Sequence, residues 1–293
     1  MSTVAGSWWR GSPGTDAGRN SGRTRGGSEA VRIDVVTIFP AMVESAVSVG
    51  VTGRARERGL WTLGCWNPRD RTSDPHRTID DRPYGGGPGM VMMAEPLAAT
   101  IAAAREVQRA AGWTRSRTIH LTPAGRPLTH ARVVALGAMR DTAFVLLAGR
   151  YEGIDERLVE REVDEEVAIG DFVVSGGELP ALMLIDALVR RLPGALNDAQ
   201  SVIEESFVDG LLDCPHYTRP EVVGGAAVPG VLLSGNHEAI RRWRLKESLR
   251  RTWRRRPDLL EGRTLTKEEA KLLREAKDEE RAAADDGGPD RIR

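Results

Sequence analysis

The two segments FVLLAGRYEGIDER, residues 144–157, and IGDFVVSGGELP, residues 169–180, decide the fold of this chain. The first begins as an apolar run typical of a buried strand, and the glycine after it lets the backbone approach a ligand closely. In open α/β sheets, ligands bind beyond the carboxyl ends of the strands. A single glycine turn would be an ordinary turn with solvated acids. Two such turns close together therefore predict a ligand site.

Strands and helices alternate along the part of the chain around these segments. We predict strands over residues 32–39, 61–66, 118–122 and 143–148, and helices over 40–47, 95–111, 130–140 and 179–192. This order is typical of an α/β fold with a mostly parallel sheet covered by helices. The helix 179–192 is apolar around much of its circumference, which indicates burial against the sheet or against a second subunit. A third turn of the ligand-contacting kind, Pro123–Pro127, follows the strand 118–122.

Composition divides the chain into five parts. We expect a disordered arm over 1–31, an α/β domain over 32–195, a flexible linker over 196–212, a small, mostly helical domain over 213–276 and a charged tail over 277–293. The arm is rich in Gly, Ser, Arg and Thr and shows no periodicity. Its arginines could contact nucleic acid, but a start codon placed too far upstream would look the same.

The charges of the chain are segregated although they cancel, with 42 basic and 42 acidic residues. The helix expected from about Glu238 carries nine basic residues among the 16 from Arg241 to Arg256, with Glu247 as the one acid in that run. Such a helix is either a solvated face or a surface that binds nucleic-acid phosphates, and this density of cations favours phosphate binding. The polar loop 67–89 is too long to be a mere spacer, and its glycines at 85–89 can present backbone N–H groups to an anion.

Several classes of protein are excluded by what the sequence lacks. Cys65 and Cys214 are too few for a disulfide framework, and neither belongs to a motif of metal-binding spacing. The five histidines are scattered, so we expect no metal site. The sequence has no apolar run long enough for a membrane helix, and we expect a soluble, cytoplasmic protein.

Taken together, five motifs resemble those of the bacterial tRNA (guanine-N1)-methyltransferases, over a match from about Arg32 to Pro257. They are DDRPYGGGPGM (80–90), GRYEGIDER (149–157), IGD through SGGELP (169–180), GLLDCPHYTRP (210–220) and LLSGNH (232–237). The resemblance implies an α/β fold of the SPOUT class with a C-terminal trefoil knot, in a homodimer whose active site lies at the subunit interface. It also implies S-adenosylmethionine as methyl donor and, as acceptor, N1 of the guanosine 3′ of the anticodon, position 37 of tRNA.

The resemblance assigns donor binding to backbone groups of three loops. Carried over by motif, the donor-binding residues are Thr122, Pro123 and Gly125, then Gly149, Tyr151 and Glu152, then Ile169, Gly170, Phe172, Val174, Gly176 and Gly177. Asp171 and Glu178, the acids that first stand out in these motifs, are then structural or donor-facing.

The resemblance assigns the chemistry to Arg190 and to the position of Glu205. N1 of neutral guanine carries a proton, so its methylation requires a base, together with a cation or donor for the charge that grows on O6. The family has an aspartate where this chain has Glu205, and a carboxylate one methylene further out acts as base only if the loop adjusts. Either Glu205 substitutes for the family's aspartate as base, or Glu204 or Asp209 takes part in removing the proton. The alternative for Arg190 is a structural role, in which its charge complements the dipole at the end of the helix.

The remaining expectations concern RNA. The residues expected to contact tRNA are Arg69, His76 and Arg77 in the long loop, and Arg241, Arg242, Arg244 and Lys246 on the basic helix. The alternative function is a non-catalytic RNA-binding protein that keeps the nucleotide pocket, and the change at Glu205 favours it. A Rossmann-type methyltransferase requires a glycine-rich turn after the first strand, and Phe39–Met42 does not supply one.

Overall fold

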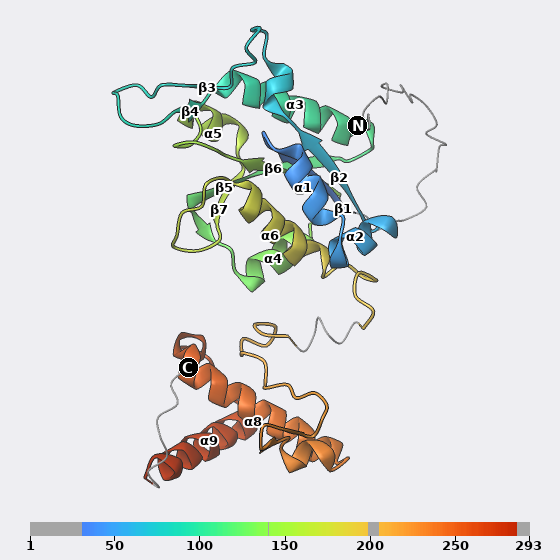
Figure 1. Ribbon diagram of the computed structural model, residues 1–293, viewed down its shortest axis with the longest axis vertical. Coiled ribbons are helices and arrows are strands. Elements are labelled where there is room, and N and C mark those ends of the chain that lie inside the picture. The colour runs from blue at the N-terminus through green and yellow to red at the C-terminus, as the bar shows by residue number, and fades with distance from the viewer. Residues whose placement is uncertain (1–30, 140, 199–204, 286–293) are drawn as a thin grey trace, which may run out of the picture.

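The computed structural model describes residues 31–139, 141–198 and 205–285. These residues form two lobes, a larger one around a β-sheet and a smaller one built mainly from two long helices (Figure 1). The expected arm 1–31 falls outside the described residues except for Val31, as do residues 199–204 of the expected linker.

The larger lobe is built on a five-stranded sheet of β1 (Val31–Val36), β2 (Trp61–Trp66), β5 (Arg115–Pro127), β6 (Thr142–Ala148) and β7 (Glu165–Ala168). The strand order is β2-β1-β6-β5-β7, and every neighbouring pair is parallel. Every residue of β6, the central strand, is buried. A parallel strand covered on both faces reads as a continuous apolar run, so the prediction of a parallel, helix-covered sheet is confirmed.

Helices cover both faces of this sheet. On one face lie α1 (Pro40–Val47), α2 (Gly50–Glu57), α4 (His130–Gly137) and α6 (Glu178–Val189), and on the other α3 (Ala94–Ala110) and α5 (Glu156–Glu162). Side chains alternate along β6. Phe144, Leu146 and Ala148 therefore join the core under α6, while Val145 and Leu147 join the core under α3.

Most element bounds agree with the sequence prediction, and the differences have local causes. The helix α1 matches its expected range. The prediction omitted the edge strand β7, which has only four residues, and the short helices α2 and α5. The strand β5 is much longer than expected because it pairs twice with β7, through Ile119–Leu121 and, beyond an irregularity, through Arg126 and Pro127.

The chain crosses back over the sheet after β7, which lies at the edge beyond β5. The segment 169–177 leads from that edge to the carboxyl end of β6, where the backbone N–H of Gly177 donates to the carbonyl of Gly149 at 2.8 Å. A Cβ on Gly177 would lie 2.6 Å from the Cα of Ala148, which is closer than real side chains come. Glycine is therefore required where the returning segment meets the central strand.

The smaller lobe packs α8 (His237–Arg255) against α9 (Lys267–Asp285), beside the short 3-10 helices Gly230–Leu233 and Pro257–Leu260 and the hairpin of β8 (Val222–Val223) and β9 (Ala226–Ala227). Asn236 caps α8 by accepting from the N–H of Ala239 at 3.1 Å, and Leu249 is the buried centre of the core. The expected linker is packed over part of its length, because Leu211 is buried in this core.

The long loop 67–89 is folded. It contains a 3-10 helix, Pro68–Arg71, and β3 (Asp80–Asp81), which pairs with β4 (Val91–Met92). The carboxylate of Asp74 accepts from the backbone N–H groups of His76 and Thr78 at 2.9 Å each, and so closes a turn. Across the described parts of the chain, no helix combines the length and apolarity needed to cross a membrane.

Candidate active site

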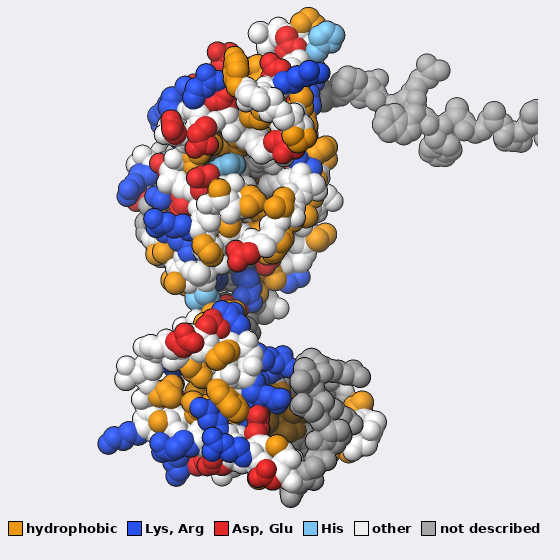
Figure 2. Space-filling view, turned by 90° about the vertical axis from the view of Figure 1, so that its left-hand side faces the viewer, with side chains coloured by type: hydrophobic (Ala, Val, Ile, Leu, Met, Phe, Trp, Pro, Cys, Tyr) orange, Lys and Arg blue, Asp and Glu red, His pale blue; other side chains and the backbone are white. Residues whose placement is uncertain are grey.

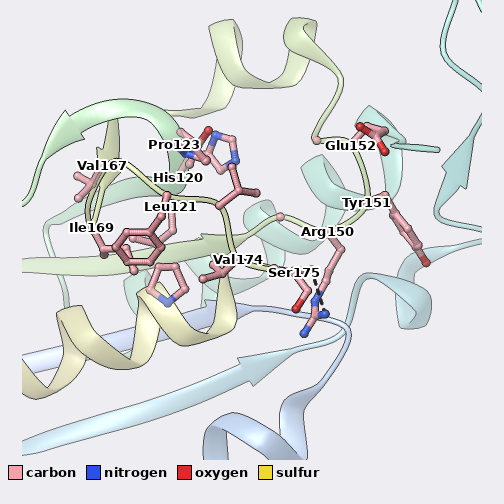
Figure 3. Close-up of a pocket in the computed structure, with 18 of the residues that line it drawn as sticks. His120, Leu121, Pro123, Arg150, Tyr151, Glu152, Val167, Ile169, Val174 and Ser175 are labelled. Atoms are coloured by element: carbon pink, nitrogen blue, oxygen red, sulfur yellow. Dashed lines mark hydrogen bonds between the residues drawn. The ribbon is translucent and has the colours of Figure 1, made fainter. Parts of the chain in front are cut away.

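A cavity of about 310 Å³ lies beyond the carboxyl ends of β5, β6 and β7 (Figure 3). Its walls are Thr122 and Pro123 after β5, residues 149–153 after β6, and residues 169–170 and 172–177 after β7. The side chains of His120, Leu121, Val167 and Pro180 complete the lining. The cavity therefore combines backbone from three glycine-bearing turns with apolar side chains.

The structure brings together all but one of the residues expected to bind a donor. Those that line the cavity are Thr122, Pro123, Gly149, Tyr151, Glu152, Ile169, Gly170, Phe172, Val174, Gly176 and Gly177. Gly125 instead faces β7, where a Cβ would lie 2.3 Å from the backbone nitrogen of Val167. Glycine at this position lets β5 and β7 approach each other, and the direct donor contact expected for Gly125 stays a prediction.

An ion pair that the sequence analysis missed holds two of these turns together. Arg150 donates from Nε to Glu178 at 2.8 Å and from Nη1 to the carbonyl of Ser175 at 3.1 Å. Glu178 is fully buried and also accepts from the hydroxyl of Thr37 at 2.8 Å. The guanidinium of Arg150 lies 4.5 Å from the centroid of the Phe39 ring. Of the two roles expected for Glu178, structural or donor-facing, these contacts favour the structural one.

Beside this cavity lies a second one of about 460 Å³, lined by Ile38, Phe39, Arg69, Arg150, Tyr151, Glu152 and Ser175. Tyr151 has a left-handed backbone conformation, with φ of 61°, and its hydroxyl lies 3.5 Å from Nη2 of Arg69. Burial and the carboxylate of Asp80 raise the pKa of Tyr151 above its ordinary value, so it is a neutral phenol at pH 7. Arg69, expected to contact RNA, thus lies beside the donor loops.

The other two loop residues expected to contact RNA differ in their surroundings. Arg77 binds Asp70 and donates from Nε to the carbonyl of Arg69 at 3.1 Å, so it stabilises the loop. His76 is exposed, and only its backbone N–H makes a described contact, to Asp74.

Arg190 and Glu205, to which the resemblance assigns the chemistry, are in contact with each other. Arg190, directly after α6, donates to Glu205, and Nη1 of Arg191 lies 3.3 Å from the same carboxylate. The pKa of nearby His130 is lowered by burial and by Arg191, with Glu205 opposing the shift. Glu204, an alternative base, lies outside the described residues. Asp209, the other alternative, accepts from Arg263 through its backbone carbonyl.

This pair lies at the opposite end of α6 from the cavity. Pro180 in the first turn of α6 lines the cavity, whereas Arg190 follows the last turn. The helix has 12 residues, so at 1.5 Å per residue the two ends are about 18 Å apart. Within one chain, the cavity and the pair are therefore separate features.

Most cations of the basic helix are paired with acids of α9. Arg241 binds Glu268 at 2.7 Å, Arg242 binds Glu275 at 2.9 Å, and Lys246 binds Glu279 at 2.7 Å. Arg250 also binds Glu279, and Arg254 lies 3.5 Å from Glu280. These contacts explain why α9 continues to Asp285 rather than ending near Ala276, and Figure 2 shows acidic side chains among the basic ones on this lobe.

Arg244 differs from these neighbours. It is exposed and forms no ion pair with any described residue. It borders a groove of about 1040 Å³ with His216, Arg219 and two aromatic rings. These rings, Tyr217 and Trp243, lie 6.3 Å apart between centroids and are tilted by 54°.

Asp213, Cys214 and His216 bring three ligand-type atoms within 4.8 Å of one another, which the sequence analysis did not foresee. Nε2 of His216 lies 2.9 Å from the carboxylate of Asp213, and burial together with Asp213 raises the pKa of the Cys214 thiol to about 11. The backbone N–H of Cys214 also donates to the carboxylate of Asp213 at 2.6 Å, so the described contacts of this cluster close a hydrogen-bonded turn.

The fold and the cavity define a class, namely α/β proteins with a parallel sheet and a ligand pocket at the carboxyl strand ends. Comparison with known proteins narrows this class. Residues 31–262 match the family model described as "tRNA (Guanine-1)-methyltransferase TrmD". The chain belongs to this family.

Curated relatives named tRNA (guanine-N(1)-)-methyltransferase support the assignment. The relative from Aromatoleum aromaticum is 61% identical over 257 residues, which are 88% of this chain and 97% of the relative. The relative from Chromobacterium violaceum is 59% identical over 250 residues, 85% of this chain and 97% of the relative. The one from Pseudomonas aeruginosa PAO1 is 59% identical over 243 residues, 83% of this chain and 94% of the relative.

Proposed function

We propose that this protein transfers a methyl group from S-adenosylmethionine to N1 of a guanine in tRNA, at the guanosine 3′ of the anticodon. The observation that carries this proposal is the cavity beyond β5, β6 and β7, which unites the backbone of three glycine-bearing turns. Membership of the tRNA (guanine-1)-methyltransferase family supplies the acceptor. We place the reaction in the cytoplasm, where the tRNA is.

The residues of the cavity fit an adenosyl group. Leu121, Pro123, Ile169 and Val174 offer apolar walls to a flat base, and the glycine turns offer backbone N–H and C=O groups to its polar edge. Bound there, S-adenosylmethionine would supply the methyl group of its sulfonium. The rest of the donor would then be left as a neutral thioether. The Arg150–Glu178 pair would keep two of the three turns closed around it.

Arg190 and Glu205 match the edge of guanine that reacts. That edge presents O6, an acceptor, next to N1–H, a donor. An arginine beside a carboxylate presents the complementary donor and acceptor. We propose that Glu205 accepts the N1 proton and that Arg190 stabilises the charge on O6 as N1 gains the methyl group.

The separation of this pair from the cavity supports a homodimer with composite sites. Reacting atoms must approach to roughly 3–3.5 Å, whereas the two features of one chain lie about a helix length apart. Phe39 and Met42 near the start of α1 and Leu179 and Met183 on α6 leave apolar side chains exposed, although α1 and α6 pack together. We propose that this apolar face binds a second copy, whose Arg190 and Glu205 complete the pocket.

We also propose that the returning segment 169–177 threads the chain into a trefoil knot. The support is its path from the edge strand β7 back to the central strand β6.

For RNA binding we favour the groove beside Arg244 over the paired cations of α8. A cation already bound to a carboxylate attracts a phosphate less, whereas Arg244 and Arg219 are exposed next to Tyr217 and Trp243. Aromatic rings beside cations are suited to stacking unpaired bases. Arg69 beside Tyr151 remains a proposed second contact, near the expected position of the guanine.

Methyl transfer is tested with labelled S-adenosylmethionine and two tRNA transcripts that differ only at the base 3′ of the anticodon. We expect label in the transcript with guanosine and none in the other. Arg190→Ala should still bind the donor while transferring at least about 100-fold more slowly. Absence of label from both transcripts would reject the enzyme and favour the non-catalytic RNA-binding alternative.

A further inference from the structure

One ionisable side chain in the cavity has no role in the function proposed above. His120 lies on β5 directly opposite Glu166 of β7 in the parallel register. It is only 7% exposed, and it lines the cavity beside Leu121 and Thr122 (Figure 3). A buried histidine at the wall of a ligand cavity is either a satisfied core residue or a ligand contact, and the orientation of its two nitrogens distinguishes these roles.

The two ring nitrogens have different surroundings. Nδ1 lies 3.2 Å from a carboxylate oxygen of Glu166. Because an ionised carboxylate can only accept, Nδ1 must carry the proton, which leaves a lone pair on Nε2 in the neutral ring. Nε2 lies 3.3 Å from the position that a Cβ on Gly149 would occupy, so it faces the turn that borders the cavity. A Cβ at residue 149 would approach this nitrogen more closely than most real Cβ contacts do, so glycine leaves the nitrogen more room.

The ring is neutral at pH 7. Burial lowers the pKa of His120 below its ordinary value, and the hydrogen bond to Glu166 and the charge of Glu166 oppose this shift. Glu166 is the charged group that faces the ring from β7, and Arg150, Tyr151 and Glu152 line the same cavity from the turn after β6. The Glu166 carboxylate therefore fixes the tautomer without charging the ring.

We propose that Nε2 of His120 accepts a hydrogen bond from an amino or hydroxyl group of the bound donor, and that Glu166 positions the ring for it. This inference rests on the proposed function, because it needs an adenosyl ligand in this cavity. Such a ligand presents an amine and sugar hydroxyls, which require acceptors once they leave water. A neutral nitrogen accepts without the cost of burying a charge.

The test is to measure the binding of S-adenosylmethionine by calorimetry, without tRNA. The proteins compared are wild type and the variants His120→Phe, His120→Gln and Glu166→Gln. His120→Phe keeps a ring of similar shape and removes the acceptor, so we expect binding about 3- to 10-fold weaker. His120→Gln can place its carbonyl oxygen near the position of Nε2 and should bind within about 2-fold of wild type. Thermal melting of each variant checks that it folds.

The pH dependence separates this role from a structural one. Protonation converts Nε2 from an acceptor into a donor, so the binding of S-adenosylmethionine to wild type should weaken as the pH falls through the pKa of His120. This loss of affinity at low pH is the acid limb of the binding profile. His120→Gln should lack this acid limb. Glu166→Gln removes the charge that favours the protonated ring, so the acid limb should move to lower pH.

Two results would overturn the inference and leave the proposed function intact. One is His120→Phe binding the donor as tightly as wild type does. The other is an acid limb that persists unchanged in His120→Gln. If wild type itself fails to bind S-adenosylmethionine at any pH, the proposed function fails with it. Should His120→Phe not fold, the comparison of wild type with His120→Gln across pH still decides.

Discussion

The carboxylate of Glu205 is held by two arginines, Arg190 and Arg191, which come from the end of α6. An aspartate at this position would have a side chain one methylene shorter. The glutamate reaches both guanidinium groups from the turn 205–210, whose neighbour Leu211 is buried in the core of the smaller lobe. A carboxylate is thus held beside Arg190, as the proposed role of Glu205 as base requires.

The first prediction concerns this base. Glu205→Gln keeps the side-chain shape but cannot accept the N1 proton, so single-turnover methyl transfer should fall by about 100-fold or more while donor binding is unchanged. Glu205→Asp should transfer within about tenfold of wild type, since it keeps the carboxylate. Near-normal transfer by Glu205→Gln would remove this residue as base and direct attention to its neighbours in the linker.

The second prediction concerns the two thiols. Burial raises the pKa of Cys65 to about 12, and burial and Asp213 raise the pKa of Cys214 to about 11, from an ordinary value of 9.0. At pH 8 both remain protonated in the folded chain, so a thiol reagent should react about 100-fold more slowly than with the unfolded chain. The reaction is followed by absorbance, with Cys214→Ala to separate the two sites. Rapid native reaction of Cys214 would contradict the hydrogen-bonded turn at residues 213–216.

At the scale of elements, the cavity depends on how the ends of three strands are joined. Gly177 and Gly125 allow backbone segments to touch where a side chain would not fit. The pair Arg150–Glu178 then links the turn after β6 to the start of α6, and Thr37 adds the end of β1. These contacts tie the turns around the cavity to the sheet and to α6.

The third prediction tests this link. Glu178→Ala leaves the guanidinium of Arg150 without its buried partner, so we expect a loss of about 3 kcal/mol in the free energy of unfolding. Denaturant unfolding provides the measurement, and Glu160→Ala, at an exposed position on α5, is the matched control with a change below about 0.5 kcal/mol. Equal stability of the two variants would show that the buried pair contributes nothing net.

The fourth prediction distinguishes two arginines on α8. Arg244→Ala should weaken tRNA binding and reduce the salt dependence of the association constant by about one unit of log–log slope, without loss of stability. Arg242→Ala, which breaks the contact to Glu275, should instead lower stability by about 0.5 kcal/mol and leave RNA affinity nearly unchanged. Fluorescence anisotropy at several salt concentrations measures the first effect. A larger loss of affinity for Arg242→Ala would reverse the assignment.

At the scale of the whole molecule, the cavity and the Arg190–Glu205 pair lie at opposite ends of α6. If they are the two halves of the proposed methyl-transfer site, a single chain does not bring them together. Two copies related by a two-fold axis can do so twice, because each contributes its pocket to one site and its pair to the other.

The fifth prediction follows from this arrangement. Val174→Trp, which fills the cavity, and Glu205→Gln should each abolish transfer as pure proteins. When the two chains are co-expressed, mixed dimers contain one site with an intact pocket and an intact pair, so activity should return to about a quarter of wild type. Light scattering checks that both variants remain dimeric. Failure of the mixture to recover activity would place each pair in the site of its own chain.

The sequence by itself determined the parallel α/β fold, the position of the glycine turns and most of the residues that line the cavity. It did so because these features are local: apolar runs specify buried strands, and glycines mark the places where the backbone comes close to something.

Only the tertiary structure decided what depends on residues distant in sequence. It placed Gly125 against β7, paired Arg150 with Glu178, turned His120 toward the cavity through Glu166, and neutralised much of α8 with the acids of α9. It also separated the Arg190–Glu205 pair from the cavity by the length of α6. The physical reason is that hydrogen bonds and ion pairs act over a few ångströms, and the fold alone sets which side chains come that close.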